Sequence, residues 1–220
     1  MICVKICGIT NWPDAEAACE AGGNLLGFNF YDKSLRRVST ADAAQIATKL
    51  PKGMEAVGVF VNANPAEIAS LRSFVRFNAA QLHGDENAAT VSQIARNMPV
   101  IKAFRAGAGF QASRFEGYSD VFAFLLDGAH GNQYGGTGHK ADWELARSFA
   151  QKHRIILAGG LTPENVAEAI LCVRPYAVDV ASGVESRPGK KDHAKLRDFI
   201  REVRRAESEL EAYAEKSEQT

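Results

Sequence analysis

Short apolar runs rich in β-branched residues recur along this chain, and amphipathic segments separate most of them. The runs predict strands over residues 2–6, 25–30, 55–61, 77–82, 99–104, 121–127, 154–158 and 176–181. The amphipathic segments predict helices over residues 13–21, 40–50, 65–73, 87–97, 142–152, 163–172 and 192–205. Residues 107–118 are Gly-rich and weakly periodic, so no clear fifth helix is predicted there. Apolar strands alternating with helices are typical of a parallel sheet covered by helices.

Eight such units are the number that closes a barrel. We therefore expect an α/β protein with a single (β/α)8 TIM barrel, for which 220 residues and 46% hydrophobic content are sufficient. Residues 1–206 form the expected barrel domain. Residues 207–220, with five glutamates and one lysine, form an acidic C-terminal extension that either prolongs the last helix or frays. An open doubly wound sheet is the alternative, but no Gly-x-Gly-x-x-Gly follows the first strand.

The charge balance narrows the range of partners. The 26 basic and 26 acidic residues cancel, whereas a nucleic-acid-binding protein would carry a basic excess. No apolar run approaches the roughly 18–20 residues that span a bilayer, and the N-terminus lacks a signal-peptide pattern. Four scattered cysteines then indicate free thiols in the cytoplasm. No His or Cys clusters with Cys3 and Cys7, so no metal site is expected.

The first strand divides into two unlike faces. Side chains alternate along a strand, so Cys3, Lys5 and Cys7 share one face and the aliphatic residues between them share the other. The aliphatic face is expected to meet the helices, which leaves Lys5 and Cys7 pointing into the barrel. Cys7 ends the strand and precedes Gly8, which allows a turn. Because active sites of such barrels lie where strands end, Cys7 is a candidate site residue.

Three later strand ends also carry unusual residues. Asp127 closes an apolar run, and the long loop after it contains a Gly-rich stretch at residues 135–138 that suits a flap over a ligand. Gly159 and Gly160 follow the seventh strand, ahead of Thr162, the expected N-cap of the next helix. Ser182 and Gly183 follow the eighth strand. Small residues after strands seven and eight are typical of phosphate sites made by backbone N–H groups.

The order and spacing of these pieces resemble phosphoribosylanthranilate isomerases from about residue 3 to residue 200. The matching segments are Val4-Lys5-Ile6-Cys7-Gly8-Ile9-Thr10, Gln81-Leu82-His83-Gly84, Leu125-Leu126-Asp127, Gly135-Gly136-Thr137-Gly138, Asp142-Trp143, Ala158-Gly159-Gly160-Leu161, Asp179-Val180-Ala181-Ser182-Gly183-Val184-Glu185 and Pro188-Gly189-Lys190-Lys191-Asp192. The chain departs from the family pattern at three places. It has Ser34-Leu35-Arg36-Arg37 where the family has Ser-Pro-Arg, Ala141 in place of a phenylalanine, and Ala181 in place of a serine.

The resemblance implies an Amadori rearrangement of phosphoribosylanthranilate in tryptophan biosynthesis. It implies Cys7 as general base and Asp127 as general acid, with no metal or organic cofactor. Arg36, or Arg37 if the missing proline shifts the alignment, would pair with the anthranilate carboxylate. His83 and Asp179 would line the substrate pocket. The phosphate would be held by backbone N–H groups of Gly159, Gly160, Ser182 and Gly183.

A base at position 7 has to be a thiolate, and an acid at position 127 has to hold a proton. Lys5, roughly 6–7 Å from Cys7 by the rise of two strand residues, is expected to help stabilise the thiolate. The apolar residues before Asp127 are expected to favour its protonated form. The expected partner is a small phosphosugar, with no nucleic acid or membrane, and the expected state is a monomer or homodimer.

Two alternatives remain at this stage. One is another phosphosugar barrel isomerase, such as the bisubstrate enzyme that also serves histidine biosynthesis. That type would carry an aspartate at the end of the first strand, where this chain has Cys7. The other is an inactive phosphate-binding scaffold, against which the retention of both Cys7 and Asp127 speaks.

Overall fold

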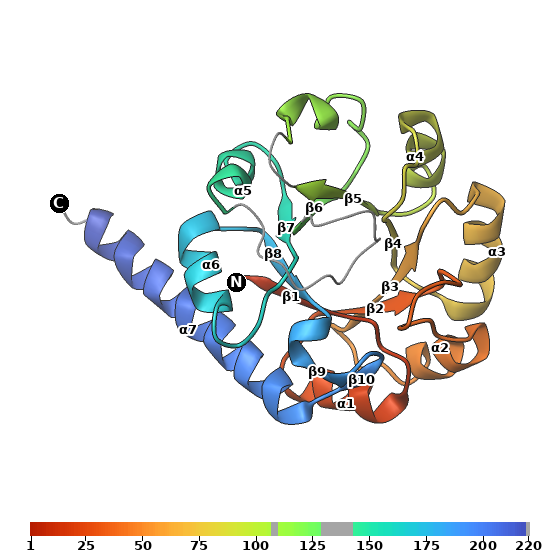
Figure 1. Cartoon of the computed structure of the whole chain (residues 1–220), viewed down its shortest axis with the longest axis horizontal. Coiled ribbons are helices and arrows are strands. Elements are labelled where there is room, and N and C mark those ends of the chain that lie inside the picture. The colour runs from red at the N-terminus through yellow and green to blue at the C-terminus, as the bar shows by residue number, and fades with distance from the viewer. Residues whose placement is uncertain (107–109, 129–142, 219–220) are drawn as a thin grey trace.

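Each of the eight expected strands forms, and together they close into one parallel barrel (Figure 1). The computed structural model describes residues 1–106, 110–128 and 143–218. The strands are β1 (Cys3–Cys7), β2 (Leu25–Asn29), β3 (Glu55–Phe60), β4 (Ala79–Leu82), β5 (Val100–Ala106), β6 (Ala123–Gly128), β7 (Ile155–Leu157) and β8 (Ala177–Val180). They pair in chain order, and β8 returns to pair with β1. This closure confirms the predicted barrel and excludes the open sheet.

Helices lie outside the barrel and connect successive strands (Figure 1). They are α1 (Trp12–Glu20), α2 (Thr40–Ala47), α3 (Pro65–Val75), α4 (Ala88–Ala95), α5 (Trp143–Ala150), α6 (Val166–Val173) and α7 (His193–Glu218). Between β5 and β6 the described residues contain a short 3-10 helix, η1 (Ala112–Phe115). The described residues of this segment contain no α-helix, in agreement with the weak periodicity of residues 107–118.

Strand alternation divides the core into two parts. Val4 and Ile6 belong to a large apolar layer between the barrel and the helices. Cys3 points the other way and packs against a smaller cluster inside the barrel that includes Leu125 and Ile156. The predicted division of the first strand into a helix-facing side and a barrel-facing side is confirmed.

Polar side chains fix where several helices begin. Asn11 accepts a hydrogen bond from the backbone N–H of Asp14 at the start of α1. Asn64 and Glu67 form a reciprocal capping box at the start of α3. Such caps satisfy N–H groups that have no partner within the helix. These caps fix the residues at which α1 and α3 begin.

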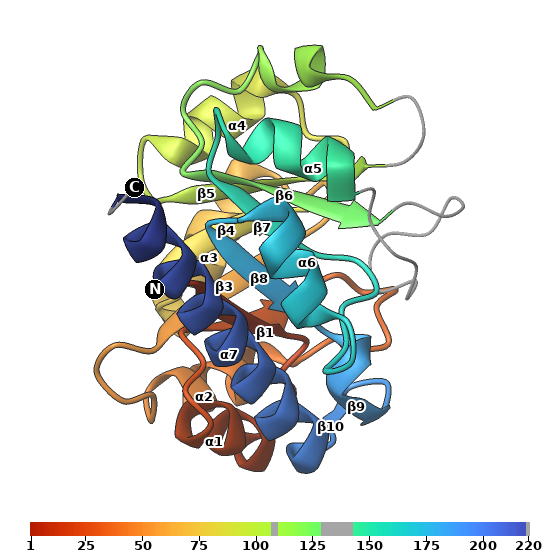
Figure 2. The same ribbon diagram turned by 90° about the vertical axis from the view of Figure 1, so that its left-hand side faces the viewer.

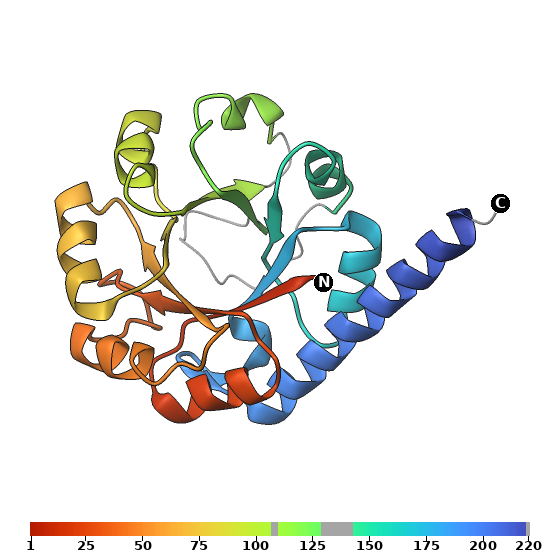
Figure 3. The same ribbon diagram turned by 180° about the vertical axis from the view of Figure 1, so that it is seen from behind.

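The last helix is much longer than the others. It packs against α6 and α1 through buried residues such as Leu196, Phe199 and Val203, then runs past the barrel (Figures 1 and 3). Of the two expectations for the acidic extension, prolongation of the last helix is what forms, because α7 continues to Glu218. Side chains of residues 211–216 are exposed. In the described part of the chain, no helix combines the length and apolarity needed to cross a membrane.

Two short strands stand apart from the barrel. They are β9 (Glu185–Arg187) and β10 (Lys190–Lys191), which form an antiparallel hairpin. The hairpin follows η2 (Ser182–Val184) and precedes α7, beside α1 (Figure 1). It lies on the side of the molecule where the strands end (Figure 2).

Candidate active site

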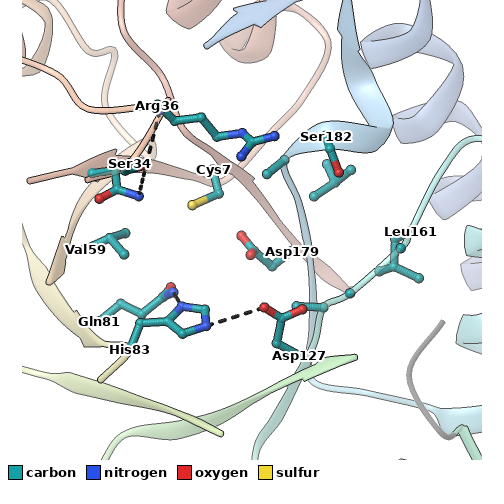
Figure 4. A pocket seen from close by; sticks show the side chains of 16 residues that line it. Cys7, Ser34, Arg36, Val59, Gln81, His83, Asp127, Leu161, Asp179 and Ser182 are labelled. Carbon is teal, nitrogen blue, oxygen red and sulfur yellow. Dashed lines mark hydrogen bonds and ion pairs between the residues drawn. The ribbon is translucent and has the colours of Figure 1, made fainter. Parts of the chain in front are cut away.

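A pocket opens where the strands end, and most of the predicted site residues meet there (Figure 4). Its lining comprises Cys7, Asn29, Ser34, Arg36, Val59, Gln81, His83, Asp127, Ala158, Gly159, Gly160, Leu161, Asp179, Val180, Ala181 and Ser182. Gly183 packs against Leu161 of this lining, and Lys5 is buried two residues before Cys7 on β1. The predicted flap at residues 135–138, with Ala141 and Asp142, lies outside the described residues.

Cys7 sits at the top of β1 beside a strand that leaves it room. Gly27 is its partner on β2, and a methyl group at Gly27 would lie 2.8 Å from Cys7 Sγ and 3.1 Å from Lys5 Nζ. The missing side chain thus creates the space that the thiol and the ammonium share. Sequence reasoning did not single out Gly27, because its role depends on the register between two strands.

Lys5 is fully buried and donates a 2.7 Å hydrogen bond to Asp179 Oδ1 on the neighbouring strand β8. Burial lowers the pKa of Lys5, but Asp179 and Cys7 outweigh it, so the net shift is upward and the ammonium is retained. Asp179 is therefore both a pocket residue, as expected, and the counter-ion of Lys5. Sequence reasoning did not foresee this pairing.

The electrostatic surroundings of Cys7 differ from the expectation. Burial raises the pKa of the Cys7 thiol, and Asp179 raises it further, whereas Lys5 and Lys191 lower it. The net shift is upward. Lys5 acts in the predicted direction, but desolvation outweighs the nearby cations, so the thiol is favoured over the thiolate in the ligand-free pocket.

Asp127, at the end of β6, faces His83 from β4 across the pocket (Figure 4). His83 Nε2 lies 3.4 Å from Asp127 Oδ2, and Gln81 Nε2 donates to His83 Nδ1 at 3.0 Å. Because Nδ1 accepts this bond, a neutral His83 ring carries its proton on Nε2, the nitrogen nearer Asp127. Both side chains are nearly enclosed, so this contact is weakly screened by solvent.

The glycines after β7 and β8 bring two loops into contact. Gly159 and Gly160 adopt positive φ values of 85° and 65°. A methyl group at Gly183 would lie 1.9 Å from the carbonyl oxygen of Leu161, so only glycine fits between the loops. Among the described residues, the backbone N–H groups of Gly159, Gly160 and Ser182 donate no hydrogen bond. These donors are available to an anionic ligand.

The loop after β7 is held by a residue other than the expected cap. Thr162 was predicted to cap a helix beginning at Pro163, but α6 begins at Val166. Asn165 instead accepts from the Thr162 N–H at 2.9 Å and donates to the Gly160 carbonyl at 2.8 Å. The predicted Thr162 cap was therefore wrong. The Asn165 side chain takes the local hydrogen bonds and supports the glycine loop.

Arg36, on the loop after β2, binds a carboxylate of this chain. Its Nε and Nη2 donate to Glu185 at 2.9 and 2.8 Å in a two-pronged contact, and the side chain lines the pocket. Arg37 instead pairs with the exposed Asp32 at 3.0 Å and does not line the pocket. Of the two arginines left open by the sequence, only Arg36 reaches the site. Glu185 was not predicted to have a role.

No metal-binding cluster is found in the part of the chain that the structure describes. Groups of three or more His, Cys, Asp or Glu side chains in a suitable arrangement are absent there. All four cysteines are free thiols.

Comparison with known proteins places this fold and site in one family. A family model described as N-(5'phosphoribosyl)anthranilate (PRA) isomerase matches residues 4–202. A protein named N-(5'-phosphoribosyl)anthranilate isomerase from Trichlorobacter lovleyi is 48% identical over 207 residues, covering 94% of this chain and 100% of its own length. The protein of the same name from Thermotoga maritima is 45% identical over 205 residues, covering 93% of this chain and 99% of its own length.

Solved structures of the same family also match this chain. The crystal structure of the Thermotoga maritima phosphoribosyl anthranilate isomerase matches with a TM-score of 0.87 and 44% identity, covering 93% of this chain and 99% of that chain. A phosphoribosyl anthranilate isomerase in complex with reduced 1-(o-carboxyphenylamino)-1-deoxyribulose 5-phosphate matches with a TM-score of 0.84 and 42% identity over the same shares. The resemblance predicted from the sequence is confirmed. The chain is an isomerase and belongs to the N-(5'-phosphoribosyl)anthranilate isomerase family.

Proposed function

We propose that this chain converts phosphoribosylanthranilate to the corresponding 1-deoxyribulose phosphate, with Cys7 as general base and Asp127 as general acid. The observation that carries the proposal is the meeting of both groups in one pocket that also holds Arg36 and the two glycine loops (Figure 4). The thiol and the carboxyl group supply a base and an acid for the rearrangement. The cation and the free backbone N–H groups supply partners for the two anionic groups of the substrate.

The substrate carries an anion at each end, and the pocket offers a suitable partner for each. The backbone N–H groups of Gly159, Gly160 and Ser182, with Gly183 allowing the loops to meet, would bind the phosphate. Arg36 would bind the anthranilate carboxylate through its remaining N–H groups. The ligand in one related structure, a reduced carboxyphenylamino deoxyribulose phosphate, carries the same two groups.

The first step opens the ribose ring. Asp127 donates its proton to the ring oxygen, the bond from that oxygen to C1 breaks, and the anthranilate nitrogen lone pair forms an iminium at C1. His83 Nε2, 3.4 Å from Asp127 Oδ2, is placed to stabilise the carboxylate that this step leaves behind. The nitrogen supplies the electron pair, so the step needs no metal or organic cofactor.

The second step transfers the proton from C2 to Cys7. The C2–H electron pair becomes the C1–C2 double bond, and the iminium nitrogen becomes neutral. Transfer of a proton to C1 and loss of the C2 hydroxyl proton then give the ketose. The thiolate is disfavoured in the empty pocket, because burial raises the pKa of Cys7. The positive iminium would oppose that shift, so the base becomes available in the complex.

The proposal is tested with freshly made phosphoribosylanthranilate, whose fluorescence falls as it isomerises. The wild-type chain is expected to turn over with and without a chelator, and Asp127→Asn is expected to lose roughly 10²–10⁴-fold in kcat. Substrate should still bind the variant. A chain without turnover would be the phosphate-binding scaffold considered above, and Asp127→Asn at wild-type kcat would exclude Asp127 as the acid.

We also propose that the chain acts as a monomer or homodimer. Support comes from a related solved structure described as mutually generated monomers of the dimeric Thermotoga maritima enzyme, 41% identical to this chain. Sedimentation at assay concentration distinguishes the two states.

A further inference from the structure

A buried lysine outside the proposed catalytic pair connects three parts of the site. Lys191, on β10, is 3% exposed. Its Nζ donates to the Cys7 carbonyl at 2.6 Å, to the Ala181 carbonyl at 3.1 Å and to Glu185 Oε1 at 3.1 Å. Three acceptors match the three N–H donors of an ammonium group. One side chain thus joins the ends of β1 and β8 to the hairpin.

Glu185 carries this connection on to Arg36. Its carboxylate is buried and accepts from Arg36 Nε and Nη2, from Lys191 Nζ and from the Gly189 N–H. A two-pronged bond fixes the plane of the guanidinium, so Glu185 determines where the remaining N–H groups point. Gly8 makes room for this arrangement, since a methyl group there would lie 2.7 Å from Arg36 Cδ.

We propose that Glu185 and Lys191 are positioning residues of the isomerase. This buried ion pair orients the arginine that receives the substrate's aromatic carboxylate and holds the strand end that carries the base. The proposal rests on the roles proposed above for Arg36 and Cys7. It adds that the arginine that binds the carboxylate and the cysteine that takes the proton are aligned with each other through one connected set of buried contacts.

The hairpin has a second anchor, so it should stay docked when the ion pair is altered. The backbone N–H of Lys191 donates to Asp14 Oδ2 at 2.8 Å, and Lys190 Nζ and His193 Nε2 lie 3.2 and 2.9 Å from Asp14 Oδ1. Asp14 belongs to α1 and has a 1% exposed side chain. Changing the charge of Glu185 or Lys191 therefore tests orientation and electrostatics rather than loss of the whole hairpin.

Glu185→Gln tests the link to Arg36. It keeps the shape but removes the charge that holds the guanidinium, so KM should rise about tenfold with little change in kcat, as expected for a lost charge-assisted contact of about 1.4 kcal/mol. In an Arg36→Ala background the same substitution should leave KM unchanged, because there is no guanidinium to orient.

The outcomes distinguish a failure of the proposed carboxylate site at Arg36 from a failure of the positioning role of Glu185. If Arg36→Ala alone leaves KM unchanged, the proposed carboxylate site is wrong. If Arg36→Ala raises KM but Glu185→Gln does not, or if the two effects simply add, Glu185 does not act through Arg36 and the positioning role is overturned.

Lys191→Met tests the link to Cys7. Lys191 opposes the burial that raises the pKa of the Cys7 thiol, and removing its charge should raise that pKa further. The acid limb of the kcat/KM profile should then move to higher pH, while Lys191→Arg should keep the wild-type limb. Lys190→Met, at a half-exposed neighbour whose ammonium contacts Asp14, is the matched control and should leave the profile unchanged. A Lys191→Met protein with a lower melting temperature but an unmoved acid limb would overturn the electrostatic role.

Discussion

The two ends of the barrel interior are built from the same strands but do different things. Cys3 and Cys7 lie on the same face of β1, on either side of Lys5. Cys3 packs against the apolar interior cluster with Leu25. Cys7 opens into a pocket lined by carboxylates, His83 and glycine loops. The end of the barrel at Cys3 is mostly apolar and is called the apolar end below. The end at Cys7 carries the charged pocket and is called the open end.

The comparison shows that a cysteine gains its chemistry from its neighbours. Burial raises the pKa of both thiols. At Cys3 the next largest influence is Glu55, which raises the pKa further, whereas at Cys7 it is the cation Lys5, which lowers it. Only the thiol at the open end has a nearby ammonium as its main electrostatic partner. The difference predicts which substitutions affect catalysis and which affect stability.

The largest difference is expected between two alanine substitutions, one at each of these cysteines. Cys7→Ala removes the proposed base and should lower kcat by roughly 10²–10⁴-fold while substrate still binds. Cys3→Ala is the matched control at the apolar end and should keep wild-type kcat. Steady-state turnover of the two purified variants measures the contrast. Equal losses in both, or near wild-type turnover in Cys7→Ala, would contradict a division of labour between the two ends.

A smaller effect is expected at the rim of the open end. Arg36→Ala should raise KM by roughly 10–100-fold, since a charge-assisted two-pronged contact contributes about 1.5–3 kcal/mol. Arg37→Ala, at an exposed arginine paired with Asp32, should leave KM within about twofold, because surface ion pairs contribute about 0–1 kcal/mol. Initial rates over a range of substrate concentrations give both values. A larger KM change in Arg37→Ala would mean that the wrong arginine has been assigned.

Beneath the site, Lys5 should control the pH dependence more than the maximal rate. The thiolate is the active form, so a higher thiol pKa moves the acid limb of kcat/KM to higher pH. Lys5 lowers the pKa of Cys7, and Lys5→Met should therefore move that limb upward. The kcat limb should lie at lower pH than the kcat/KM limb in the wild type, because the proposed iminium favours the thiolate. A Lys5→Met profile that scales down without moving would show that another group sets the thiol.

The sequence predicted the fold more completely than the site. All eight strands were found because alternating apolar segments are local signals, and so was the inward face of β1. What was missed depends on contacts between distant residues. Arg36 meets Glu185 149 positions away, and the space around Cys7 depends on Gly27 in the next strand.

Two further features depend on a competition that the sequence does not resolve. Cys7 has a cation beside it, as predicted, but the desolvation that raises its pKa is larger, and the size of that effect follows only from the packed structure. Thr162 has the residue type of an N-cap, yet Asn165 takes the local hydrogen bonds and fixes the Gly160 loop instead. Glu185 and Lys191 belong to segments that matched the family pattern, so that match was the available signal for their importance.

The smallest expected effect lies at the apolar end, where the substitution changes only packing. Ile156 on β7 is fully buried in the interior cluster. Ile156→Val removes one buried methylene and should cost about 0.5–1.5 kcal/mol of the free energy of unfolding. For a chain of this size that corresponds to a fall in melting temperature of roughly 1–6 °C, measured by thermal denaturation. Below that temperature kcat and KM should be unchanged, because the substitution alters neither the charge nor the shape of the pocket. A drop in kcat with an unchanged melting temperature would show that the apolar end is coupled to catalysis, and the contrast between the two ends would fail.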